Sequence, residues 1–247
     1  MNDFPPYDDL KKIEPQMMVS IMEKINQSFS DELTPISDRI ESINLFRSLR
    51  KFNHSYFLEL FGALKSKFLK NCLHYIENPR IQQISLNFIK EIFDDDSYDV
   101  SNEMVYCLYY DILRFLKCNN NILKEMAKSC IKTMSEKVAN DAKIIVLIET
   151  LKNADQNLCV FIFDCFRIAI EHLRGYIYLN YNFNDILEKL NLEEASDDYL
   201  SKIKHIFQIL KNSMDKNDEE EIISSLRGEN LTLYHSFTNR YFNNKFI

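Results

Sequence analysis

Apolar residues recur along this chain with the period of an α-helix, most regularly between Asn78 and His172. Three segments in that stretch share one spacing, with apolar side chains at i, i+3, i+7 and i+11, and so on one helical face. They begin at Ile81, Leu123 and Leu158. A short polar break precedes each segment, and another amphipathic stretch precedes each break. The pattern predicts helix, polar turn and helix, repeated about every 35–47 residues, which is typical of an α-solenoid.

The same pattern extends over most of the chain and sets its expected organisation. Residues 14–52, 56–93, 101–138 and 140–173 each predict one helical hairpin, residues 183–214 predict a weaker one, and residues 218–241 predict an atypical capping pair. In the second hairpin the first helix is expected over residues 56–77, with Ile76 on its buried face. The chain has only 3 glycines in 247 residues, far fewer than the tight turns of a β-rich fold require. We therefore expect an all-α fold, an α-solenoid of about six HEAT-like helical hairpins. Residues 1–13 are expected to be a flexible tail, and residues 14–247 a single domain.

Composition narrows the range of partners. The formal net charge is −7, which disfavours nucleic acid because phosphate binding needs a basic surface. No apolar run reaches the roughly 18 residues of a membrane span, so no membrane partner is expected. Most of the six cysteines fall in the apolar phase of the predicted helices. This favours reduced, buried thiols in a cytoplasmic protein.

Motifs that carry chemistry are missing from the sequence. Three isolated glycines cannot form a phosphate-binding loop, and the chain contains neither HExxH nor CxxC. The acidic run at residues 94–96 lacks the glycine and distal glutamate of an EF-hand loop. We therefore expect a non-enzymatic protein with no catalytic residues, no metal site and no cofactor.

Two polar strings beside the predicted turns resemble a known family. Asp38, Arg39 and Glu41 stand among apolar residues at the opening of the predicted helix that ends near residue 52, and Asn78-Pro79-Arg80 precedes the helix that begins at Ile81. Together with the repeats over residues 119–172, these strings resemble the TOG domain, a HEAT-repeat domain, of the CLASP and crescerin type. The resemblance extends over residues 15–241 and implies a flat, paddle-like array.

The resemblance also implies a partner and a binding edge. In TOG domains the turns inside each repeat line one narrow edge, which binds tubulin through an aromatic residue and several basic ones. The corresponding residues here are Ile36, Arg39, Arg80, Lys117, Asn119, Asn120, Lys152, Asn153 and Ser196. The aromatic position falls on Ile36, the chain has no tryptophan, and the fifth turn is acidic at Glu193 and Glu194. These departures predict weakened tubulin-binding turns.

Two functions are therefore expected from the sequence. The first is a tubulin- or microtubule-associated protein of the cytoplasm and cytoskeleton, with a cilium or flagellum as a candidate location. The alternative is a generic HEAT or armadillo adaptor that binds a different protein. The missing tryptophan and the acidic fifth turn favour the alternative, because a lost aromatic anchor lowers interface affinity by about 2–4 kcal/mol.

Overall fold

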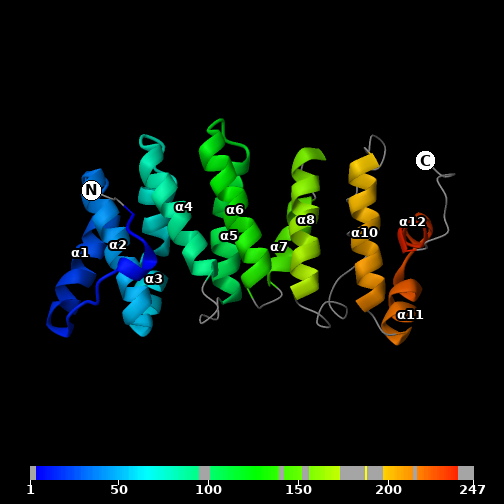
Figure 1. Cartoon of the computed structure of the whole chain (residues 1–247), viewed down its shortest axis with the longest axis horizontal. Coiled ribbons are helices and arrows are strands. Elements are labelled where there is room, and N and C mark those ends of the chain that lie inside the picture. Colours follow the sequence, from blue (N-terminus) through cyan, green and yellow to red (C-terminus); the bar gives the residue numbers. More distant parts are fainter. Residues whose placement is uncertain are drawn as a thin grey trace. The chain divides into compact units, whose positions relative to one another are not determined.

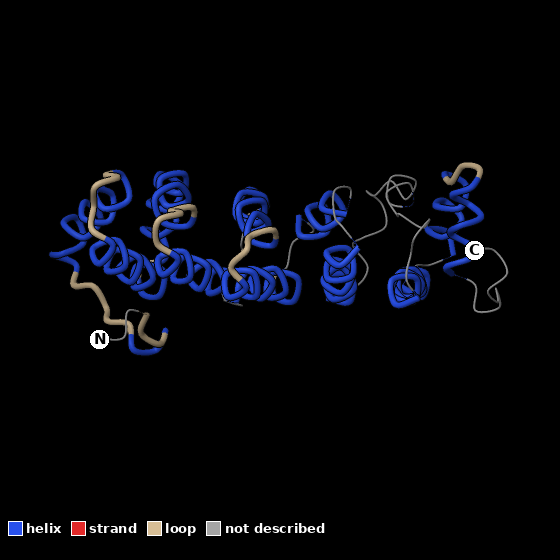
Figure 2. Tube along the Cα trace, turned by 90° about the horizontal axis from the view of Figure 1, so that it is seen from above, coloured by secondary structure: helices blue, strands red, loops and turns tan. Residues whose placement is uncertain are grey.

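The described part of the chain is helical (Figures 1 and 2). The computed structural model describes residues 4–94, 101–138, 142–151, 156–172, 187, 197–213 and 216–238. Its α-helices are α1 (Met18–Ser30), α2 (Ile36–Phe52), α3 (His54–Phe68), α4 (Pro79–Asp94), α5 (Asn102–Leu116), α6 (Asn121–Lys137), α7 (Ala142–Leu151), α8 (Gln156–His172), α10 (Asp197–Ser213), α11 (Lys216–Ser225) and α12 (Glu229–Thr238). Two short 3₁₀ turns, Tyr7–Asp9 and Pro15–Met17, precede α1. No strand occurs among these residues, which confirms the all-α class.

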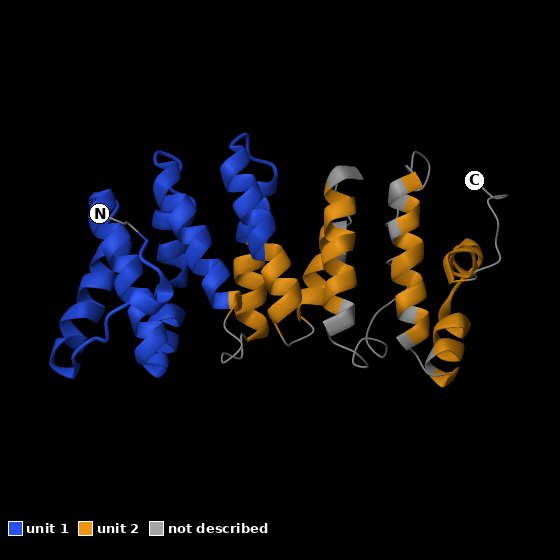
Figure 3. Ribbon diagram, in the orientation of Figure 1, with its two compact units in different colours: residues 1–92, 111–130 blue, residues 93–110, 131–247 orange. Residues whose placement is uncertain are grey.

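The chain divides into two compact units (Figure 3). Unit 1 contains Met1–Ile92 and Asp111–Cys130, and unit 2 contains Phe93–Tyr110 and Ile131–Ile247. Helices α5 and α6 are therefore each shared between the units. The assembly of all hairpins into one solenoid stays a prediction.

Aromatic packing forms the core of unit 1. Helices α1, α2 and α3 contact one another, and six phenylalanine rings meet between them and α4 with centroids 5.0–6.3 Å apart. These rings belong to Phe29, Phe46, Phe57, Phe61, Phe68 and Phe88, and each is at most 2% exposed. They stand on the faces that the 3.6-residue period predicts. Such tilted and edge-on pairs add about 0.5–1.5 kcal/mol each to the energy of burial.

The segment before α1 packs against α2. Arg47 is fully buried, its Nε donates to Glu91 at 2.7 Å, and another of its nitrogens donates to the carbonyl of Pro5 at 2.9 Å. The Phe4 ring covers the same guanidinium at 3.5 Å, and Leu10 is buried further along. Residues 4–8 thus contact α2, and the flexibility expected of residues 1–13 stays a prediction. Residues 1–3 lie outside the described part.

The long helix expected over residues 56–77 has different ends. It begins at His54, and its last turn, Leu69–Leu73, is a π-turn closed by a bond from the His74 N–H to the Leu69 carbonyl at 2.8 Å. Because the helix ends at Leu73, Ile76 does not join the buried face that the pattern assigned to it. Ile76 is 86% exposed, so that assignment was wrong.

In unit 2, α8 contacts both α7 and α10, and α10 contacts α12. Buried polar contacts between separate elements also lie within this unit. The Tyr109 hydroxyl lies 2.8 Å from that of Thr150, and Lys143 donates to the Ser135 carbonyl at 2.9 Å. Among the described residues, none of the helices combines the length and the apolar character that a membrane span needs.

Candidate protein-binding edge

Three interhelical turns lie at one end of the unit 1 helices. They are residues 31–35 between α1 and α2, residues 74–78 before α4, and residues 117–120 between α5 and α6. Figure 2 looks onto this end and shows them as tan loops above the helices that they join. We refer to these as turns 1, 2 and 3, and to the surface that they form as the turn edge. These are the intra-repeat turns of the first three predicted hairpins.

Arg39 fastens turn 1 to the end of α3. Its side chain is fully buried. One guanidinium nitrogen donates to the Asn71 carbonyl at 2.8 Å, and another donates to the Glu32 carbonyl at 2.7 Å and the Asp31 carbonyl at 3.3 Å. The guanidinium also lies 4.5 Å from the centre of the Tyr75 ring. A charged donor satisfies these carbonyls more strongly than a neutral one does, so Arg39 fixes the position of turn 1.

Further polar contacts connect neighbouring turns. Lys70 pairs with Glu32 of turn 1, and this pairing lowers the pKa of the Glu32 carboxyl. His74 of turn 2 lies 2.7 Å from an oxygen of Asp111 on α5, and its ring stacks on Phe115 at 5.7 Å. The Lys70 pair is exposed and contributes little. The His74 contact is more than three-quarters buried and is the stronger restraint.

Asparagine and aspartate side chains set the backbone of each turn. The Asn78 side-chain oxygen accepts the Arg80 N–H at 2.9 Å, and the Asn120 side-chain oxygen accepts the Ile122 N–H at 3.0 Å. These are N-terminal caps of α4 and α6, which satisfy donors that a helix start leaves unpaired. In turn 1, Asp31 accepts the Leu33 N–H at 2.9 Å. The three turns are therefore ordered by their own side chains.

Each turn presents a large aliphatic side chain to solvent. Leu33 of turn 1 is 90% exposed, Ile76 of turn 2 is 86% exposed, and Ile122, directly after turn 3, is 60% exposed. Exposed hydrophobic residues are common singly, and here one belongs to each of the three turns, which makes this edge the candidate surface for a partner. These exposed positions could not be predicted from the sequence, because Leu33 stands in a polar break and Ile76 continues the helical period.

The residues predicted to form the binding edge differ in position and in exposure. Arg80, Lys117 and Asn119 are exposed on or beside turns 2 and 3. Asn120 caps α6, while Ile36 begins α2 and is partly buried. Arg39 is buried, so its side chain supports the turns from below. The other three, Lys152, Asn153 and Ser196, lie outside the described residues.

The metal-ligating side chains and the thiols of the described residues bear on whether this part of the chain has a reactive site. Within the described part of the chain, no cluster of histidine, cysteine, aspartate and glutamate could hold a metal ion. Burial raises the pKa of Cys72, Cys130 and Cys165 to about 12. These thiols stay protonated near neutral pH and are poor nucleophiles.

Comparison with known proteins leaves the family open. No protein-family model matches the chain, and no curated protein matches it significantly.

Proposed function

We propose that this protein is a non-enzymatic binding module that contacts a protein partner through the turn edge, and that tubulin, free or in the microtubule lattice, is that partner. The observation that carries the proposal is the row of exposed Leu33, Ile76 and Ile122, one for each turn of unit 1. Burial of apolar surface contributes about 25 cal/mol per Å². An edge whose backbone is already ordered loses little entropy when a partner covers it.

The proposal of tubulin rests on the resemblance to TOG domains and on the placement of the basic residues. Intra-repeat turns share one edge in TOG domains, and turns 1 to 3 share one edge here. Arg80 and Lys117 are exposed there, in positions suited to an acidic surface. A cytoplasmic, cytoskeletal location, including a cilium or flagellum, belongs to the same proposal.

Co-sedimentation with microtubules and titration of free tubulin test the proposal directly. We expect saturable binding with a dissociation constant of about ten micromolar or lower. Ile76→Asp is expected to weaken binding about tenfold or more, because it places a charge in an apolar contact, and Arg80→Glu is expected to weaken it and to reduce its dependence on salt. Leu58→Asp is the matched control. Leu58 is 42% exposed near the start of α3, at the helix end opposite turn 2.

Absence of binding at tens of micromolar, or equal losses for Ile76→Asp and Leu58→Asp, would refute tubulin as the partner at this edge. Circular dichroism spectra of all variants separate lost binding from lost folding.

A second candidate function, an adaptor for a protein other than tubulin, is favoured by turn 1. Asp31 and Glu32 are exposed there, and Ile36, just after the turn, stands at the position where a TOG domain relies on an aromatic anchor. An acidic first turn repels an acidic partner. This candidate gains support if a purified partner binds the chain stoichiometrically and loses affinity with Ile76→Asp, while tubulin does not bind.

A further inference from the structure

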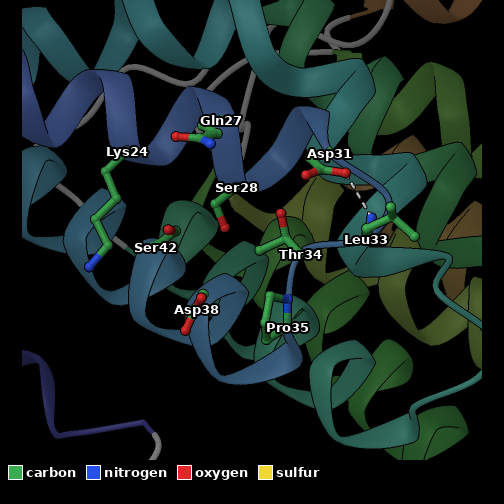
Figure 4. A pocket seen from close by; sticks show the side chains of 9 residues that line it. All are labelled: Lys24, Gln27, Ser28, Asp31, Leu33, Thr34, Pro35, Asp38 and Ser42. Carbon is green, nitrogen blue, oxygen red and sulfur yellow. Dashed lines mark hydrogen bonds between the residues drawn. The ribbon is translucent and has the colours of Figure 1, made fainter.

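A pocket opens between α1 and α2, beside turn 1. Its volume is about 320 Å³, at the lower end of the range for small-ligand pockets. Figure 4 shows the Ser28 side chain on α1 and the Ser42 side chain on α2, with Thr34 and Asp31 of turn 1 and Asp38 of α2 around them. Leu33, the exposed aliphatic residue of turn 1, also lines this pocket. The pocket is therefore continuous with the turn edge.

Two hydroxyl groups at the floor of this pocket have no bonding partner. Ser28 is 4% exposed and Ser42 is fully buried. Neither hydroxyl oxygen makes a hydrogen bond to any residue that the structure describes. Buried hydroxyls without a partner are unfavourable, and native proteins contain few of them. A ligand group that carries hydrogen-bond donors would relieve this cost at both positions.

The charge of the pocket selects the type of ligand. Asp31 and Asp38 contribute two carboxylates to the lining. Each accepts one local hydrogen bond, Asp31 from the Leu33 N–H at 2.9 Å and Asp38 from the Ser37 hydroxyl at 3.1 Å. An ionised carboxylate has about four acceptor positions, so each retains capacity for a ligand.

The cation in the lining, Lys24, does not neutralise these carboxylates. Its Nζ lies 2.6 Å from Glu41, a residue that does not line the pocket. Counting this pair as neutral, the pocket presents two negative charges and several neutral acceptors. Anionic ligands are therefore disfavoured, and a cationic ligand with several donors is favoured.

We propose that this pocket receives the guanidinium group of an arginine on the partner protein; the presence of such a partner rests on the proposed function. A guanidinium has five N–H donors in a planar fork and no acceptor. Such a fork can pair with a carboxylate of the lining, Asp31 or Asp38, while its remaining N–H groups face the hydroxyls that have no partner. A lysine ammonium has three donors at a single point and cannot span these groups. The arginine anchors the partner next to Leu33.

Capped arginine, N-acetyl-arginine methylamide, is a probe that does not require the partner to be known. Titrated into the ¹⁵N-labelled full chain, it is expected to produce saturable shifts confined to resonances of residues 24–42. The dissociation constant of one anchored side chain should be on the order of 1 mM. Capped citrulline has a similar shape without the charge and should bind at least about tenfold more weakly. Free arginine tests whether the natural ligand is the amino acid itself.

Two variants and a control complete the test. Asp38→Asn should weaken capped arginine about tenfold, and Thr34→Phe, which fills the pocket, should abolish the shifts. Glu59→Gln removes an exposed carboxylate on α3 and should leave binding unchanged. The absence of saturable shifts, equal binding of citrulline, or an unaffected Asp38→Asn would overturn the proposal. If free arginine binds about tenfold more tightly than capped arginine, the ligand of the pocket is the amino acid itself and not a side chain of a partner protein.

This outcome is separable from that of the proposed function. If Ile76→Asp disrupts partner binding while capped arginine never binds, the turn edge stands and the pocket fails. If capped arginine binds but no edge variant affects a partner, the pocket stands and the proposed function fails.

Discussion

Replacing Arg39 with methionine tests whether this residue supports the turn edge or contacts the partner. Arg39 is fully buried and donates to the carbonyls of Asn71, Glu32 and Asp31 at 2.8, 2.7 and 3.3 Å. Hydrogen bonds from a charged group contribute about 1.5–3 kcal/mol each. Two effects reduce this stabilisation. Desolvation of the buried charge costs several kcal/mol, and the Nε of Arg39 is buried without a hydrogen-bond partner among the described residues. We expect a net loss of about 2–3 kcal/mol in the unfolding free energy of unit 1.

The matched control is Arg80→Met, because Arg80 is exposed at the start of α4. Its effect on stability should stay within about 0.5 kcal/mol. Urea denaturation measures the free energies, and amide hydrogen exchange locates the change. Exchange in Arg39→Met should accelerate at residues 31–39 and 69–75. A loss below about 0.5 kcal/mol, with exchange unchanged in those segments, would show that the three bonds contribute nothing net and that our account of Arg39 is wrong.

Four further outcomes follow from local environments. An added methyl at Gly62 in α3 meets no atom within 4 Å, so Gly62→Ala should raise stability by about 1 kcal/mol in thermal melts. Gly228→Ala should lower stability, because Gly228 has φ +48°. Burial lowers the pKa of Lys143 to about 7 from 10.5. The unfolded chain therefore binds more protons between these values, and stability should rise with pH from about 7 to about 10.5, by up to 1.4 kcal/mol per unit, in wild type but not in Lys143→Met. The thiol of Cys130, with its pKa raised to about 12, should react with iodoacetamide in the native protein at least about a hundredfold more slowly than the partly exposed Cys118.

Helix phase could be predicted because it depends on local spacing. Ile81, Ile84 and Phe88 repeat at the helical period, and all three are buried on one face of α4. The period continues beyond a helix whenever the next apolar residue happens to fall in phase. Ile76 does so, and nothing in the sequence shows that a π-turn ends the helix at Leu73. The exposure of Ile76, on which the candidate site depends, was therefore missed.

Buried polar residues could not be assigned because their partners are distant in the sequence. Arg39 stands near an expected turn and, read alone, is indistinguishable from an exposed basic residue. Its acceptor is the carbonyl of Asn71, 32 residues away. Carbonyls carry no side-chain signature, so no residue type marks the pairing. Arg47 shows the same limit, since it bonds to the Pro5 carbonyl across 42 residues.

The exposed row and the buried arginine depend on each other physically. Leu33 is 90% exposed, and an exposed aliphatic side chain on a mobile loop would lose most of its binding energy to ordering of the loop. Arg39 reduces this loss because it holds the loop in place. It donates to the carbonyls of Asp31 and Glu32, just before Leu33, and to the carbonyl of Asn71. The charge buried at Arg39 therefore fixes the position of an apolar contact that it does not itself make.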